Sequence, residues 1–309
     1  MTFQHWEQFY QQFPIYLEKL PYHRYICESL LTGDLNHLPN CLLYGPKGFP
    51  YEILIEYSIS KYFNTSFPIQ KRYPVWNQSL PYTETNYYFC IDTEHPEFPK
   101  EIDGLVEFIK SIVQTKCIHL TRHIILLKNM DQIAHRKNSF YFRVLLERFS
   151  QNVLFINTTH HIQMIEAPLL SRMTSYRVPL PKKDDLIAIL YDLCPSLSSI
   201  PDTRNLCLCL FHLPNGDFST LHYPPIVELK KKKMTTLELR QLCYKIFQYQ
   251  ISVREVIQDC LNLLDQDEQR HHWIVESVSI EHRSILSDPV KKYYYIEWIL
   301  HHFQTPFVK

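Results

Sequence analysis

The chain has 309 residues, of which 45% are hydrophobic and 21% charged, and its 32 Lys and Arg side chains balance 32 Asp and Glu side chains. This length allows two or three domains with a sizeable core. The balanced charge gives no sign of a nucleic-acid partner, so any basic surface must be local. No apolar run approaches the length of about 18 residues that a membrane span needs, so we expect no membrane association.

Glycine is scarce and unevenly placed. An average content of about 7% predicts about 22 glycines for this length, whereas the chain has 5. Gly45 and Gly48 nevertheless fall within four residues. We therefore expect unusual backbone angles or a close backbone approach at this point.

Cysteine and histidine give no metal signature. The chain has nine cysteines and 16 histidines, but no CxxC pair and no HExxH motif occurs. We expect free thiols and no metal site.

In chain order, residues 1–40 are predicted to be helical, and the apolar segment NCLLYG forms a buried strand that enters a loop at 45–50. A noisy helical pattern follows in YEILIEYSISKYF, and then a strand in YYFCID at 87–92. Residues 101–116 have apolar side chains at i, i+3, i+4 and i+7, which is typical of an amphipathic helix.

The segment HIILLKNMDQI (123–133) contains a continuous apolar strand, as a central strand of a parallel sheet should, and NVLFINTT (152–159) predicts another buried strand, with the helix SFYFRVLLERFS between them. Strands that alternate with helices indicate an α/β fold. From about Pro179 the pattern is helical to the end of the chain, interrupted by polar turns and by a basic run, Lys230 to Lys233. That run is read as a solvated loop, with a contact to DNA or to a partner as the other possibility.

Four segments are read together, because each alone is a weak signal; the fourth is the helical C-terminal part, most simply an interaction domain. The loop GPKGFPYE resembles a phosphate-binding loop, yet Tyr51 and Glu52 stand where a lysine and a hydroxyl would hold phosphates and Mg²⁺. In IILLKNMDQI, Lys128 and Asn129, followed by Asp131, replace the acidic pair that would support metal-assisted hydrolysis. Lys47 comes too early in the loop to substitute for the missing lysine, and an ordinary strand–turn–helix remains an alternative.

The third segment, APLLSRM, presents Ser171 and Arg172 after a short helix. An arginine at such a tip can reach across a subunit interface and stabilise charge on the γ-phosphate of a neighbour. The other interpretation is a surface arginine in a local salt bridge.

Taken in order, these segments resemble the AAA+ clamp-loader family, in particular the small subunits of replication factor C. The resemblance rests on YHRYICESLLTGDLNHLPNCLLYGPKG, on IILLKNMDQI with FRVLLERFSQN, on APLLSRMTSYRVPLP, and on the C-terminal helices LRQLCYKIFQYQISVREVIQDCLNLL and KKYYYIEWILHHF. It implies a parallel-sheet core of the P-loop type at 1–179, a helical lid at 180–223, a linker at 224–236 and an all-helical collar for oligomerisation at 237–309.

Within that family the chain is most similar to the subunit whose own ATPase site is degenerate. The degenerate loop consists of Gly45, Lys47, Gly48, Tyr51 and Glu52, of which Tyr51 and Glu52 depart from the family pattern. The other departures are Lys128 and Asn129 in the second motif, His160 at a sensor position, Ser219 and Thr220 in the lid, and Met173 in place of a cysteine. Ser171 and Arg172 match the family pattern. The resemblance therefore implies no nucleotide of the chain's own, with ATP and Mg²⁺ in neighbouring subunits and Arg172 as an arginine finger given in trans.

The resemblance also implies partners: the other subunits of a hetero-pentamer, a PCNA-like sliding clamp, and primer–template DNA held by its phosphates. Expected DNA contacts are Lys110, His135, Arg136 and Lys137, although solvated charges explain each of them equally well. Phe108 is a candidate contact to the clamp, with core packing as its alternative. We expect the nucleus as the location in a cellular organism, or a cytoplasmic replication site for a large DNA virus.

Two other functions remain open. An active ATPase with a divergent site would show saturable binding and turnover of MgATP by the chain alone. A DNA- or partner-binding module derived from the same fold would leave the ATPase activity of every partner unchanged when Arg172 is replaced by alanine.

Overall fold

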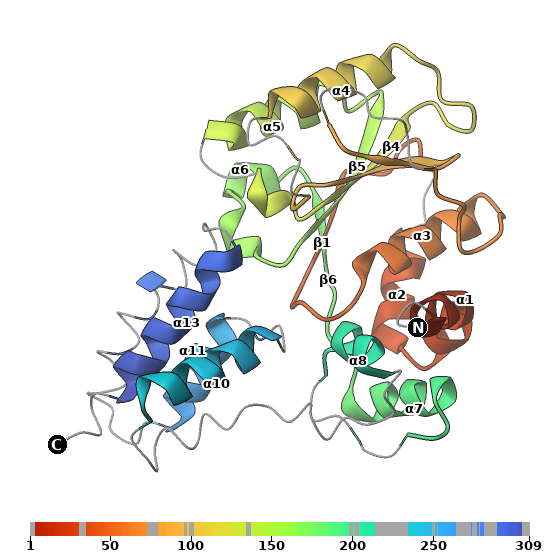
Figure 1. Ribbon diagram of the computed structural model, residues 1–309. Coiled ribbons are helices and arrows are strands. Elements are labelled where there is room, and N and C mark those ends of the chain that lie inside the picture. The colour runs from red at the N-terminus through yellow and green to blue at the C-terminus, as the bar shows by residue number, and fades with distance from the viewer. Residues whose placement is uncertain are drawn as a thin grey trace. The chain divides into compact units, whose positions relative to one another are not determined.

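The structure is a computed structural model that describes residues 4–30, 35–72, 80–95, 98, 102–133, 137–197, 200, 204–213, 234–248, 251, 253–263, 273, 277, 279–280 and 289–304. The chain forms two compact units, each of which is described by itself. The first comprises Met1–Leu197 and Arg204–Gly216, and the second Ser198–Thr203 and Asp217–Lys309 (Figure 1).

The first unit is built on a six-stranded sheet with the order β2-β3-β4-β5-β1-β6. Its strands are β1 (Cys41–Tyr44), β2 (Thr83–Glu84), β3 (Tyr88–Asp92), β4 (His123–Lys128), β5 (Val153–Thr159) and β6 (Thr174–Arg177). All neighbouring pairs are parallel except β2 and β3. The predicted α/β class with a parallel sheet is confirmed. The carboxyl ends of β1, β3, β4 and β5 meet at one edge, where parallel sheets place their functional groups.

Burial explains why the central strands were recognisable. β5 is buried along its whole length and β4 along all but its last residue, because helices cover both faces of the sheet. α4 (Asp103–Val113) and α5 (Lys137–Arg148) lie on one side, and α1 (Gln4–Glu18), α2 (Pro21–Leu30) and α3 (Tyr51–Tyr62) on the other (Figure 1). Leu105, Phe142 and Phe155 belong to the core between the sheet and the first of these layers.

Two further helices of the first unit, α7 (Lys183–Leu193) and α8 (Leu206–His212), come from the predicted lid. Both contact α1, and Lys19 forms an ion pair with Asp192 of α7. Just before α7, the Pro179 carbonyl accepts a hydrogen bond from His23 Nε2 over 2.9 Å. The end of the predicted lid from residue 214, including Ser219 and Thr220, and most of the predicted linker with Lys230 to Lys233 lie outside the described residues.

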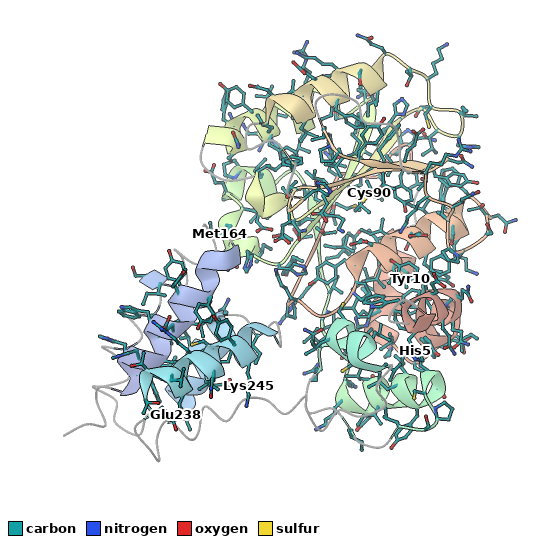
Figure 2. All side chains as sticks on the ribbon, viewed as in Figure 1. His5, Tyr10, Cys90, Met164, Glu238 and Lys245 are labelled. Carbon is teal, nitrogen blue, oxygen red and sulfur yellow. The ribbon has the colours of Figure 1, made fainter. Side chains whose placement is uncertain are left out.

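The second unit is mainly helical in the part that the structure describes. α10 (Thr236–Gln248), α11 (Val253–Leu263) and α13 (Pro289–Gln304) share a core that includes Leu242, Val256 and Ile299. α10 begins with a reciprocal cap, in which Thr235 Oγ1 accepts from the Glu238 N–H (3.3 Å) and Glu238 Oε2 accepts from the Thr235 N–H (2.7 Å). Figure 2 labels Glu238 and Lys245 on this helix. Among the described helices of both units, none is long and apolar enough to cross a membrane.

Candidate functional site: a nucleotide-type loop filled by its own side chains

The loop at residues 45–50 joins β1 to α3 and is packed from within by aromatic rings. Phe49 and Tyr51 are 3% and 4% exposed. The Phe49 ring lies 4.2 Å from the His23 ring, and the Tyr51 ring lies 5.0 Å from the His160 ring. Residues at the start of the helix that would face a bound phosphate in a working loop are here directed into the protein.

Two carbonyl groups of this loop bind side chains. Tyr51 Oη donates to the Pro46 carbonyl over 2.9 Å, and His160 Nδ1 lies 3.2 Å from the Gly45 carbonyl, which requires a proton on Nδ1. Burial, and after it the charge of Lys47, lowers the pKa of His160 to about 4, so the ring is neutral near pH 7. Pro46 and Pro50 supply no N–H groups. A loop that cradles phosphate relies on such N–H groups, so this loop is poorly suited to an anion.

The two glycines have the roles that their clustering predicted. Gly48 has φ +121°, a backbone angle that side-chain-bearing residues rarely adopt. A Cβ on Gly48 would lie 2.8 Å from Asn205 Cγ, and a Cβ on Gly45 would lie 2.1 Å from the Val178 carbonyl oxygen. The Cys207 N–H donates to the Gly48 carbonyl over 3.1 Å, so the start of α8 is docked directly on the loop.

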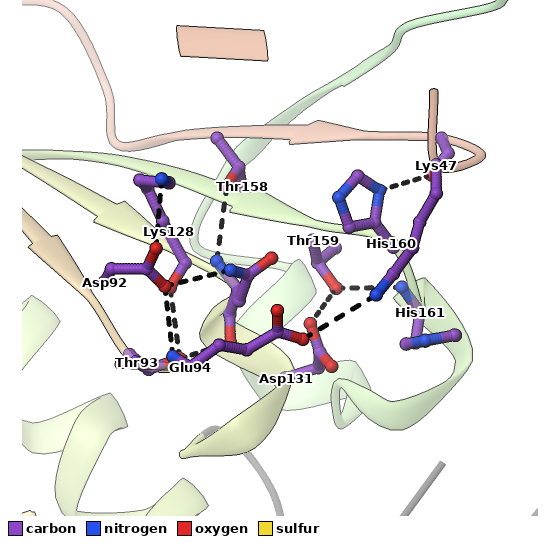
Figure 3. Close-up of polar contacts among 12 residues, drawn as sticks. Lys47, Asp92, Thr93, Glu94, Lys128, Asp131, Thr158, Thr159, His160 and His161 are labelled. Carbon is purple, nitrogen blue, oxygen red and sulfur yellow. Dashed lines mark hydrogen bonds and ion pairs between the residues drawn. The ribbon is translucent and has the colours of Figure 1, made fainter. Parts of the chain in front are cut away.

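A three-residue charge cluster, Glu52–Lys128–Asp92, lies at the carboxyl edge of the sheet. Figure 3 shows two of its members, Lys128 and Asp92. Lys128 Nζ is 2.6 Å from Glu52 Oε1 and 3.0 Å from Asp92 Oδ2. Burial opposes ionisation of Lys128 and of Asp92. At Lys128 the charges of Glu52 and Asp92 outweigh burial and raise its pKa. At Asp92 the charge and hydrogen bond of Lys128, with hydrogen bonds from the Glu94 N–H and from Asn129, outweigh burial and lower its pKa. The unusual residues at the loop and at the second motif therefore neutralise each other.

The other residues of the second motif also join this edge. Asn129 adopts a left-handed conformation (φ 54°) and its Nδ2 donates to Asp92 Oδ1 over 3.0 Å. Asp131 is 4% exposed and accepts a 2.6 Å bond from Thr159 Oγ1. Burial raises the pKa of Asp131 to about 6, against the effect of the Thr159 bond. Lys47 lies 3.9 Å from Glu94 across the same edge (Figure 3).

These residues do not fit a Mg²⁺–nucleotide complex. The ammonium of Lys128 occupies the position between the Glu52 and Asp92 carboxylates and would repel a cation placed there. Within the part of the chain that the structure describes, no three His, Cys, Asp or Glu side chains are arranged to hold a metal ion. The geometry therefore gives no support for nucleotide hydrolysis at this loop.

Sequence reasoning missed Asp92, Glu94, Thr158 and Thr159 as members of this site. Asp92 ends the predicted strand YYFCID, and Thr158 and Thr159 end NVLFINTT. The signal was available, because polar residues at the ends of parallel strands meet at one edge of the sheet.

Arg172 follows the short helix α6 (Ala167–Leu170) at a separate place on the first unit. Its Nε donates to Glu147 Oε1 of α5 over 2.6 Å, and its Nη1 donates to the Pro168 carbonyl over 2.6 Å and to Ser171 Oγ over 3.3 Å. The side chains of Arg172 and Glu147 are 35% and 52% exposed. The local salt bridge that the alternative interpretation expected is present, and the guanidinium is still accessible to solvent.

Of the predicted DNA contacts, Lys110 is exposed on α4. Lys137 begins α5, whereas His135 and Arg136 fall outside the described residues. The prediction for Phe108 needs correction. Phe108 is only 2% exposed, because its ring packs against Tyr82 (4.7 Å) and Phe89 (5.6 Å). It is a core residue and offers no surface to a clamp.

No family model and no curated protein matches the chain. Solved structures with some similarity include a DNA polymerase III gamma subunit-related protein from Thermotoga maritima, at 14% identity over 92% of this chain and 98% of that one, with a TM-score of 0.40. The FIGL-1 AAA domain matches at 17% identity over 62% and 59% of the two chains (TM-score 0.38). A RuvB variant of Thermotoga maritima matches at 12% identity over 60% and 51% (TM-score 0.34). Similarities at this level assign no activity to the chain.

Proposed function

We propose that the chain is a non-catalytic subunit of a sliding-clamp loader of the replication factor C type. In this role it supports ATP-driven loading of a clamp onto primer–template DNA without hydrolysing ATP itself. It contributes to a hetero-oligomeric ring and gives Arg172 to the nucleotide of a neighbouring subunit. ATP and Mg²⁺ belong to that neighbour.

The observation that carries the proposal is the Glu52–Lys128–Asp92 cluster. It links the loop to the second motif by direct charge contacts, where a working site would use a lysine, a metal ion and acids. Together with the buried Phe49 and Tyr51, it gives the loop a structural role. A loop that is kept and filled in this way favours an architectural subunit over an ATPase.

The exposure and the ion pair of Arg172 support its proposed role as an arginine finger for a neighbouring subunit. An exposed ion pair contributes at most about 1 kcal/mol, and the Arg172–Glu147 pair is a third to a half exposed. A phosphate could therefore replace Glu147 as the partner at small cost, since guanidinium binds phosphate with two parallel hydrogen bonds. Glu147 holds the arginine in an ordered position until a neighbour arrives.

The test starts from the assembly purified from its native source, with its subunits identified by native mass spectrometry. Reconstitution with Arg172→Ala should leave the subunit composition intact. ATP turnover at the neighbouring site that receives Arg172 should fall about 10³–10⁵-fold. The ATPase rate of the whole assembly should therefore fall by at least the fraction that this site contributes to it. Arg172→Lys should restore little, because lysine cannot form the two-pronged contact.

Arg24→Ala is the matched control, because Arg24 is an exposed arginine whose ion pair with Glu28 is also at the surface. It should leave turnover and assembly unchanged. If Arg172→Ala also leaves every partner's turnover unchanged, the arginine-finger role is wrong and a DNA- or partner-binding module becomes the better description. MgATP turnover by the chain alone would contradict the non-catalytic role.

A further inference from the structure

Helix α5 carries an exposed aromatic patch, which consists of Phe140, Tyr141, Arg143 and Val144. Phe140 is 57%, Tyr141 55% and Val144 38% exposed. The Phe140 and Tyr141 rings lie 5.9 Å apart at 78°, and Arg143 Cζ lies 5.0 Å above the Phe140 ring. Large apolar side chains that gather at one place on a surface commonly mark an interaction site.

The core does not explain these side chains. The same helix directs Phe142, Leu145 and Leu146 into the core, where they are at most 4% exposed. The helix thus has an ordinary buried face, and the patch lies on its solvent side. Polar residues usually occupy such positions.

Helical spacing places the patch beside the arginine-finger candidate. Phe140, Val144 and Glu147 are separated by four and three residues, so they line one face of α5. Glu147 is the residue that binds Arg172. The helix rises about 10 Å from Phe140 to Glu147, and a standard interface covers about 800 Å² on each partner. Any protein that covers Arg172 along this helix would also cover the patch.

We infer that the aromatic patch on α5 is the docking surface for the neighbouring subunit whose nucleotide receives Arg172. This inference rests on the proposed function and extends it to a specific surface. The composition fits a protein partner, because aromatic residues and arginine are enriched at protein interfaces and supply most of their strongest contacts. Exposed rings would bury apolar area around the arginine and exclude water from it.

Nucleic acid is the other occupant that aromatic and basic side chains can bind, since bases stack on exposed rings. The position of the patch favours a protein. Phe140 and Val144 share a helix face with Glu147, which binds Arg172, so the subunit that receives Arg172 would lie over the patch as well. A protein partner suits both the rings and the Arg172–Glu147 pair.

The test places a photoreactive benzophenone amino acid at Tyr141 in the reconstituted assembly, with primer–template DNA present. We expect cross-links to a single partner subunit, in a peptide next to that subunit's nucleotide-binding loop. The matched control is the same amino acid at Tyr25 of α2, which is 68% exposed and should not cross-link to that peptide. Cross-links from Tyr141 to DNA, to a protein without a nucleotide site, or to nothing would overturn the inference.

The double variant Phe140→Ser, Tyr141→Ser gives a second reading. Both side chains are more than half exposed, so the far-ultraviolet circular dichroism should stay unchanged, while affinity for that partner should fall at least about 10-fold. Unchanged affinity would contradict the inference. The two proposals can fail separately. If Arg172→Ala has no effect on turnover but Tyr141 still cross-links beside a partner's nucleotide loop, the docking surface stands and the finger does not.

Discussion

Replacing Lys128 by alanine tests whether the charge cluster holds the loop to the sheet. The substitution removes the ammonium that lies 2.6 Å from Glu52 and 3.0 Å from Asp92. It leaves the two carboxylates facing each other without a cation between them. We therefore expect a loss of stability in the first unit that is larger than for an ordinary surface ion pair.

The magnitude follows from the exposure of the pair. Exposed pairs contribute up to about 1 kcal/mol, and breaking a buried pair costs about 3–5 kcal/mol. The Lys128 side chain is 22% and the Glu52 side chain 32% exposed, so solvent screens part of the interaction. An intermediate loss of about 2 kcal/mol is expected, which corresponds to about a 30-fold change in an equilibrium constant.

Amide hydrogen exchange in β4, followed by mass spectrometry, measures this loss for the first unit alone. Exchange in β4 should become about 30-fold faster in Lys128→Ala when it proceeds through unfolding of the unit. Arg24→Ala is the control, because the side chains of the Arg24–Glu28 pair are 55% and 62% exposed and their loss should change exchange by less than about 3-fold. A double-mutant cycle with Glu52→Ala should give a coupling of about 1–2 kcal/mol.

The pH dependence provides a second check on the same cluster. The folded pKa of Asp92 is lowered, so its contribution is present above the unfolded value of about 4 and is lost as the pH falls through the folded value. The folded pKa of Lys128 is raised, so its contribution is lost only as the pH rises above about 10.5. The effect of Lys128→Ala should therefore be constant between about pH 5 and 9. A coupling near zero, or an effect that disappears at neutral pH, would refute this reasoning.

Three further predictions concern the loop. Gly48→Ala should destabilise the docking of α8 by about 2–3 kcal/mol, because φ at Gly48 is +121° and the new methyl group would meet Asn205. The variant should increase the rate of amide hydrogen exchange, relative to the wild type, more in α8 than in α4. Tyr51→Phe removes the donor to the Pro46 carbonyl and should cost about 1 kcal/mol without creating MgATP binding, which calorimetry can check. His160 has a folded pKa of about 4, below the unfolded value of about 6.5, so the unfolded chain binds the extra proton and stability falls as the pH drops through this window. The slope of the unfolding free energy against pH in this window should be smaller in His160→Gln than in the wild type, by the equivalent of about one proton. Equal slopes in the variant and the wild type would show that the imidazole is not held neutral.

The sequence predicted the parts of the fold that long apolar runs determine. β4 and β5 were recognisable because both of their faces are buried. β6 was missed because its four residues, Thr-Ser-Tyr-Arg, are polar and largely exposed, and only its register with β1 makes it a strand. Such pairing depends on the tertiary structure and leaves little trace in a short segment.

The site was predicted in part, for a similar reason. Tyr51, Glu52 and Lys128 stood out because they depart from the pattern of a phosphate-binding loop and its acidic partner. Their contact with Asp92 depends on the register between β3 and β4, in which Asp92 lies opposite Lys128. Phe108 was a candidate contact to the clamp, and the neighbouring rings that bury it come from β3 and from Tyr82, far from it in sequence.

The Glu52–Lys128–Asp92 cluster also makes it difficult for single substitutions to create a site for a metal ion and nucleotide at this edge. Lys128→Asp alone would bring a third carboxylate to Glu52 and Asp92, and Glu52→Thr alone would leave a lysine where a metal ion must bind. Each single step is unfavourable before the other has occurred, so the two positions must change together. Only a paired change of Glu52 and Lys128 would make this edge of the sheet accessible to a cation, so the cluster resists change by single substitutions.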